Sequence, residues 1–189
     1  MGQTMLVIAA FSMLSILALS INGTFLTAMA TGLSAQAQLN ALSMAQSLLD
    51  EVLARDFDEE VTGGVRAFAN SDFTTTANFG SDGGGEAISG RDSSYQSKTR
   101  FDDVDDYHGY LRAVQDSVLG WFNISCAVSY ARETYPDSLL TDRSHYKVVT
   151  VTVTHNNLPT REVTDSTGAS YDVMIPVELK DIAVYRRYF

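Results

Sequence analysis

Hydrophobic and polar residues divide the N-terminal third of this chain into two parts with different patterns. Residues 1–31 include the apolar run LVIAAFSMLSILAL, and no Asp, Glu, Lys or Arg occurs before Asp50. From Ala41 onward, apolar side chains recur three and four residues apart, which is the period of one helix face. The pattern predicts one continuous helix that is hydrophobic over residues 1–31 and amphipathic over 32–60.

This helix is too long to be covered by the rest of the chain. From Gln3 to Phe57 it extends roughly 80 Å at about 1.5 Å per residue, whereas a domain of the remaining size is only about 30–40 Å across. Lipid or other copies of the helix must cover the remainder. The stripe expected to pack on the chain's own domain consists of Ala41, Leu42, Ala45, Leu48, Leu49, Val52 and Leu53.

The hydrophobic half is long enough to cross a bilayer core of about 30 Å. It lacks the basic residues that begin a removable secretory signal, so we expect it to persist in the mature protein. Its Ser and Thr side chains can bond to their own helix carbonyls and let other helices approach closely. Asn22 and Gly23 weaken the helix, and we predict a local loss of helical hydrogen bonds there in the assembled state.

The C-terminal part has the pattern of strands. Residues 122–130 alternate between apolar and small polar side chains, and YKVVTVTVTH at 146–155 is rich in β-branched residues. Short turns between such runs indicate an antiparallel sheet at residues 120–189, with Pro176 at an edge or bulge. A Gly/Ser-rich loop region at 61–119 precedes it. The predicted fold class is α+β, with the long helix packed on the sheet.

Net charge and sequence motifs narrow the classes of function that are open to this chain. The net charge is −10, which argues against nucleic acid as a partner because phosphate binding requires clustered Lys and Arg. Cys126 is the only cysteine, so no internal disulfide can form, and its strand pattern predicts burial. No known catalytic motif occurs and the three histidines are scattered, so we expect no enzyme activity.

The densest group of possible metal ligands lies in FDDVDDYHGY at 101–110. It comprises Asp102, Asp103, Asp105 and Asp106. Clustered carboxylates repel one another, so we expect a surface site whose charge is relieved by calcium or by basic groups of a neighbouring subunit. The candidate basic groups are Arg161, Arg186 and Arg187. A solvated acidic turn without a cation is the alternative, because the EF-hand pattern is absent. No other cofactor is indicated.

Two glycosylation sequons occur, at Asn22-Gly23-Thr24 and Asn123-Ile124-Ser125. The first lies within the hydrophobic helix, so we regard it as fortuitous. Asn123 falls on the outward side of an expected strand and is therefore the candidate acceptor.

The segment LSAQAQLNALSMAQSLLDEVLARDF resembles the second half of a pilin helix. YKVVTVTVTH with the terminal strand pair is similar to the sheet of a minor pilin or pseudopilin. In architecture the whole chain resembles type IV pilins and the pseudopilins of type II secretion. It departs from them at position five, where Met5 stands in place of the usual glutamate. The register between subunits must then come from packing and from polar groups of the helix.

The resemblance implies a structural subunit of a type IV pilus-like filament at the cell surface. It implies passage through the inner membrane, with a prepilin peptidase and an assembly platform as partners, and self-association through the N-terminal helix. The residues predicted to contact other copies are Gln3, Thr4, Met5, Leu6, Ile8, Phe11, Leu14, Leu17, Ile21, Phe25, Leu26, Leu33 and Leu39. The alternatives are a membrane-anchored monomeric adhesin or calcium-binding surface module, and a type II secretion pseudopilin.

Overall fold

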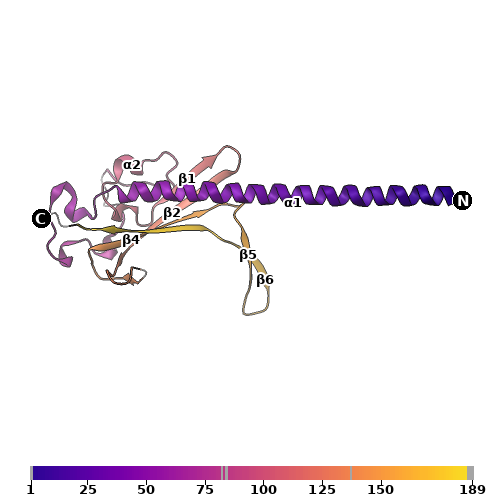
Figure 1. Cartoon of the computed structure of the whole chain (residues 1–189). Helices are drawn as coiled ribbons and strands as arrows, with labels where there is room; N and C mark the ends of the chain where they lie inside the picture. The colour runs from indigo at the N-terminus through magenta and orange to yellow at the C-terminus, as the bar shows by residue number, and fades with distance from the viewer. Residues whose placement is uncertain (1, 82, 84, 137, 187–189) are drawn as a thin grey trace.

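A computed structural model describes residues 2–81, 83, 85–136 and 138–186. It contains one 52-residue helix, α1 (Gly2–Leu53), whose N-terminal part projects as a rod from a mixed α and β domain (Figure 1). We call residues 2–33 the stem and residues 34–186 the head. The long helix packs on an antiparallel sheet, which confirms the predicted α+β fold.

The described residues of the head form seven strands and several short helical segments. The helical segments after α1 are η1 (Glu59–Gly64), η2 (Asn70–Asp72), η3 (Thr76–Asn78), α2 (Ser97–Arg100) and η4 (Asp105–Tyr107). The strands are β1 (Leu111–Asp116), β2 (Gly120–Ala131), β3 (Leu139–Leu140), β4 (Tyr146–Thr154), β5 (Thr160–Thr164), β6 (Ser170–Met174) and β7 (Val177–Val184).

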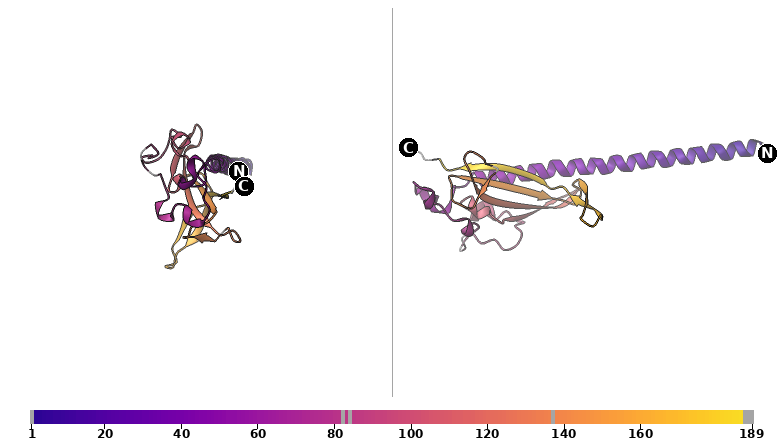
Figure 2. Two further views of the ribbon diagram at one scale, coloured as in Figure 1. Left: turned by 90° about the vertical axis from the view of Figure 1, so that its left-hand side faces the viewer. Right: turned by 90° about the horizontal axis from the view of Figure 1, so that it is seen from below.

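The main sheet has the order β1-β2-β4-β7, with the short β3 also paired to β2. All of its pairings are antiparallel. The β5–β6 hairpin forms a separate two-stranded sheet inserted between β4 and β7. It projects from the end of the head nearest the stem (Figures 1 and 2).

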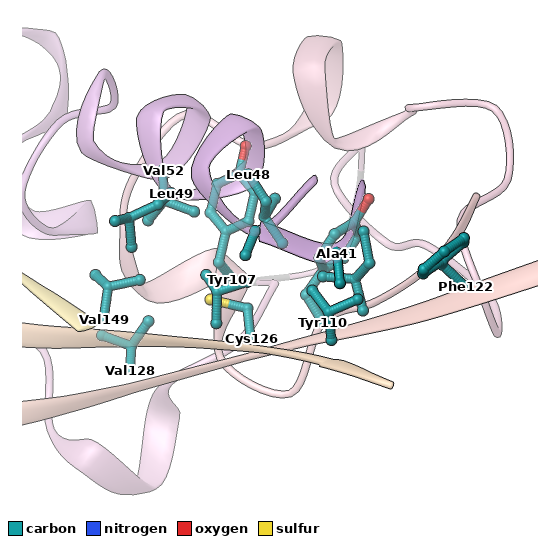
Figure 3. Close-up of a cluster of buried hydrophobic side chains, with 14 of the residues drawn as sticks. Ala41, Leu48, Leu49, Val52, Tyr107, Tyr110, Phe122, Cys126, Val128 and Val149 are labelled. Carbon is teal, nitrogen blue, oxygen red and sulfur yellow. The ribbon is translucent and has the colours of Figure 1, made fainter. Parts of the chain in front are cut away.

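The core lies between α1 and the central strands of the sheet (Figure 3). Ala37, Ala41 and Ala45 are fully buried, and their small side chains let the helix lie close to the sheet. The facing rows on β2 and β4 are alternate residues, as expected for strands with one face buried. The buried members of these rows are Phe122, Ile124, Cys126, Val128, Tyr130, Val149, Val151 and Val153. One residue of the predicted helix stripe, Leu42, is instead exposed.

The helix ends earlier than the sequence pattern predicted. It stops at Leu53 rather than Phe57, because the following backbone pairs with another segment. The Asp56 amide donates to the Asp102 carbonyl, and the Val104 amide donates to the Asp56 carbonyl. Phe57 then turns onto the sheet beyond the end of the helix, where it joins a second apolar cluster with Phe73 and Tyr130.

Two further differences concern the strands. β1 lies within residues 61–119, which were predicted to be loop. Its sequence LRAVQD contains a single β-branched residue, and the strand is stabilised by pairing with β2 along its whole length. The β5–β6 hairpin pairs only with itself, so residues 120–189 contribute strands to two antiparallel sheets rather than to the one that was predicted. Pro176 lies in the break between β6 and β7, which agrees with its expected place at an edge or bulge.

Candidate functional site

In the described part of the chain, exposed large apolar side chains are concentrated on the stem. Every residue from 2 to 33 is exposed in the single chain. The exposed fractions of its large side chains reach 74% for Met5 and 78% for Leu19. At about 1.5 Å per residue this segment extends roughly 50 Å, and it is apolar and long enough to cross a membrane. Monomeric soluble proteins rarely expose an apolar patch of this extent, so the stem requires a partner or a bilayer.

The residues that the sequence predicted to contact other copies are all accessible. Each of them, from Gln3 to Leu39, is exposed in the structure. Leu39 is notable because it lies where α1 already packs on the head, yet 68% of it is exposed on the opposite side of the helix. The accessible apolar surface therefore continues from the stem along the outer side of the head. Contact with other copies stays a prediction.

One face of the stem is a shallow groove lined by small side chains. The lining residues are Ser20, Gly23, Thr24, Thr27, Ala28, Thr31, Gly32 and Ala35. The hydroxyls of Thr24 and Thr27 donate to carbonyls four residues earlier in the same helix, at 3.0 Å each. A second helix can therefore approach this face closely while these two hydroxyls keep their hydrogen bonds. Small residues were predicted in this segment, whereas their location on one shared face of the helix was not predicted. Their spacing of four along the sequence already indicates that shared face.

The helix is continuous through the predicted weak point at Asn22 and Gly23. Nothing of the head covers this segment, and the Thr27 hydroxyl bonds back to the Gly23 carbonyl. The structure describes a single chain, so the local loss of helical bonds in the assembled state stays a prediction.

The acidic segment is not the surface site that the sequence predicted. Asp103, Asp105 and Asp106 are buried, and only Asp102 is exposed. The Asp106 carboxylate accepts from the Asp102 amide at 3.1 Å, while the Asp103 carboxylate accepts from the Asp106 amide at 3.0 Å. These bonds turn the side chains back onto their own backbone, because the segment packs beside the residues that follow α1.

Asp105 differs from the other three carboxylates because a cation lies beside it. It forms an ion pair with Lys147 on β4, so the basic group beside it belongs to the same chain. Of the arginines expected to relieve the charge, Arg161 and Arg186 form no ion pair with this turn in the described part of the chain, and Arg187 lies outside the described residues.

The remaining carboxylates form two groups that share Asp102. One contains Glu59 with Asp102 and Asp103, and the other contains Glu86 with Asp102 and Asp106. In each group the carboxylate oxygens lie within 4.8 Å of one another. Hard oxygen ligands at this spacing suit calcium. Calcium binding at these residues stays a prediction. The potential ligands now include Glu59 and Glu86 and no longer include Asp105.

Burial changes the acidity of this turn. It raises the pKa of Asp103 to about 9, and the negative charge of Asp105 adds to the effect. Burial likewise raises the pKa of Asp106 to about 7, with a further contribution from Glu86. Asp103 is therefore protonated at neutral pH, and Asp106 titrates close to it.

Lys147 lies at the centre of a buried polar cluster that was not predicted from the sequence. Its ammonium group pairs with Asp58 and Asp105 and also donates to the Phe57 carbonyl. The Tyr130 hydroxyl also donates to the Asp58 carboxylate, at 3.0 Å. Period-two alternation places Lys147 in the same row as Val149, and this signal in the sequence could have revealed its burial.

A second buried cluster connects α1 to β1. Arg112 donates to both carboxylate oxygens of Glu51, at 2.7 and 2.8 Å, and also to the Ser97 hydroxyl. The Tyr107 hydroxyl donates to the same Glu51. Both clusters hold loops of the head against the helix end. Their charges are satisfied within the chain, and we assign them a structural role.

The other candidate residues have ordinary surroundings. Asn123 is half-buried on β2, and its side-chain oxygen accepts from Arg91 at 2.8 Å. Glycosylation there stays a prediction. Cys126 is buried, as predicted, and burial raises the pKa of its thiol to about 12.

Comparison with known proteins identifies no relative. No protein-family model, curated protein or solved structure matches the chain. The function must therefore be argued from the stem, the head and their chemistry.

Proposed function

We propose that this chain is a structural subunit of a type IV pilus-like extracellular filament, assembled through its N-terminal helix. The observation that carries the proposal is the stem, a charge-free helix of residues 2–33 that the head leaves wholly exposed. Before assembly, the inner membrane is the environment that suits this helix. After assembly, stems of other copies replace the lipid.

The length of the exposed surface favours assembly over simple anchoring. A membrane span needs about 20 apolar residues. Here the uncharged surface continues past the stem to Leu39, on the outer side of the head-covered helix. An anchor has no use for apolar surface at this position, whereas neighbouring helices in a bundle would cover it.

Burial of this surface supplies the driving force for assembly. At about 25 cal/mol per Å², several hundred Å² of apolar area buried per neighbour contributes on the order of 10 kcal/mol before entropic costs. The groove around Ala28 adds a place where two helix backbones can come close. Because the stem carries no charged side chain, the stability of the bundle should depend little on salt.

The second candidate is a membrane-anchored monomer, such as an adhesin, because the same helix is long and apolar enough to span a bilayer. The two functions make opposite demands on the small-residue groove. A monomer in lipid tolerates a larger apolar residue anywhere on the stem. A helix bundle tolerates it only where no close neighbour lies.

Ala28→Leu tests this difference, with Ala30→Leu as the matched control outside the groove. Both substitutions add the same apolar volume, so membrane insertion should be unchanged in each. Electron microscopy and immunoblotting of material sheared from cells measure assembly. We expect filaments containing the wild-type and Ala30→Leu chains, and few or none with Ala28→Leu.

The outcomes separate the candidates. Membrane insertion of the wild-type chain without sheared filaments would favour the anchored monomer. Assemblies confined to the periplasm would favour a type II secretion pseudopilin. Equal filament yields from both leucine variants would remove the small-residue groove from the interface.

A further inference from the structure

The β5–β6 hairpin lacks partners that its own composition requires. Glu162 and Asp172 are directly opposite each other across the two strands, and both are exposed. Like charges in this position destabilise a hairpin. Neither carboxylate forms an ion pair with the part of the chain that the structure describes.

The other face of the hairpin carries exposed apolar side chains beside the exposed Arg161, which is directly opposite Val173. Tyr171 is 52% exposed and Val173 is 37% exposed. An isolated two-stranded hairpin is only marginally stable in water. This element therefore combines an unrelieved acidic pair with uncovered apolar side chains, at the end of the head nearest the stem (Figure 1).

The opposite end of the head carries a groove of complementary character. The end of α1, residues 61–68 and the end of β7 line it, and its volume is about 670 Å³. Among the described lining residues, Arg55, Arg66 and Arg186 are cationic and Asp56 is the single acid. In a chain of net charge −10, this local excess of positive charge is unusual.

The cations of the groove are incompletely paired. The Arg55 Nε atom is buried without a hydrogen-bond partner among the described residues. Arg66 and Arg186 form no ion pair with them. Apolar side chains lie beside these charges, and Val65 and Phe68 are 61% and 73% exposed. The groove thus offers cations that can pair with Glu162 and Asp172, and apolar surface that can cover Tyr171 and Val173.

We infer that the β5–β6 hairpin of one copy occupies the groove of the next copy along the filament. Hairpin and groove lie at opposite ends of the head along the axis of α1, because β4 runs from the groove end to the hairpin and β7 returns (Figures 1 and 2). A contact between two different surfaces of identical subunits builds an open helical polymer when the rotation between neighbours does not close a ring. This inference rests on the proposed function, and it adds a contact between the heads of successive copies to the contacts between their stems.

Charge reversal on the full chain tests the contact. Asp172→Arg and Arg66→Glu each place like charges together, and we expect each to lower the yield of sheared filaments about tenfold, equivalent to about 1.4 kcal/mol. The chain carrying both substitutions restores opposite charges between copies and should recover to within about threefold of wild type. Asp142→Arg and Arg132→Glu make the same charge changes at other exposed positions and should leave the yield unchanged.

Disulfide trapping gives a second measurement that does not depend on yield. Cells producing two forms of the chain, one with Asp172→Cys and one with Arg66→Cys, should form a disulfide-linked dimer in mixed filaments. The native Cys126 is buried and should not react. A chain with Asp142→Cys in place of Asp172→Cys is the control and should give no dimer.

The results distinguish this contact from filament formation itself. Filaments with normal yield in both reversals and no trapped dimer would overturn the hairpin contact and leave the stem-based filament in place. A wild-type chain that forms no filaments would overturn both. Recovery in the double variant together with a trapped dimer would establish the contact.

Discussion

The Lys147 ammonium lies 2.8 Å from the Asp58 carboxylate, and both side chains are fully buried. The pair connects the central strand β4 to the loop that follows α1. The rings of Phe57, Phe79 and Tyr130 lie against the ammonium, each with its centroid 4.6 to 5.4 Å away. The ion pair therefore fixes the chain at the point where the long helix ends and the loops of the head begin.

Replacing this lysine should destabilise the head strongly. Lys147→Met keeps most of the apolar volume but leaves the carboxylates of Asp58 and Asp105 without their cation. Removing one partner of a buried ion pair costs about 3–5 kcal/mol. Chemical denaturation of the full chain in detergent, followed by near-ultraviolet circular dichroism, measures the loss.

Lys180→Met is the matched control for that substitution. Lys180 pairs with Glu178 on β7, but both side chains are about half exposed. Exposed pairs contribute about 0–1 kcal/mol, so the control should change the unfolding free energy little. Equal effects of the two substitutions would show that the Lys147 cluster does not stabilise the head.

The stability of the head should fall as the pH rises from about 6 to 8. Buried Asp103 and Asp106 have pKa values of about 9 and 7, both above the ordinary value of an unfolded Asp near 4. The folded state then binds more protons than the unfolded state, so this stabilisation is present at low pH and is lost as the pH rises through these values. We expect a loss of roughly 3–4 kcal/mol in the unfolding free energy over this range, with Asp103 contributing more than Asp106.

Asp106→Asn isolates the contribution of Asp106, which is the smaller of the two. The Asn side-chain oxygen can still accept from the Asp102 amide but does not titrate. The variant should show a flatter dependence on pH in the same denaturation assay. A wild-type stability that rises over the same pH range would contradict the assignment.

Calcium should raise the thermal midpoint of the chain in detergent at a pH of about 8, where most of these carboxylates are ionised. The two groups of carboxylates share Asp102, so a bound cation would relieve their repulsion. Asp102→Asn should abolish the increase, whereas Asp142→Asn at another exposed position should not. Identical melting curves in calcium and in chelator would reject the metal site and leave a charge-strained turn.

A charge in the stem should prevent assembly. Ala10→Asp places an unpaired carboxylate on a helix segment that is uncharged and fully exposed in the single chain. We expect no sheared filaments, with an unchanged near-ultraviolet spectrum from the head. Ala10→Ser is the control, because Ser can bond to its own helix backbone. Normal filaments from the Asp variant would mean that the helix serves only as an anchor.

The sequence was informative where a residue's surroundings follow from its neighbours along the chain. The spacing of Ala41, Ala45 and Leu48 indicated the buried face of α1, and the structure confirms it. The alternation from Phe122 to Tyr130 likewise indicated which side of β2 is buried. These patterns are reliable because helix and strand periods fix which residues share a face.

The absence of charge before Asp50 determined by itself that the chain has a long apolar stem. Only the tertiary structure decided what covers each face of the head. Lys147 shares a row with Val149, but the row extends beyond the end of α1, where Asp58 and Asp105 meet the lysine. These contacts join segments that are far apart in the chain, and the local spacing of hydrophobic residues does not indicate them. For the same reason the burial of the acidic turn and the projection of the β5–β6 hairpin emerged only from the folded molecule.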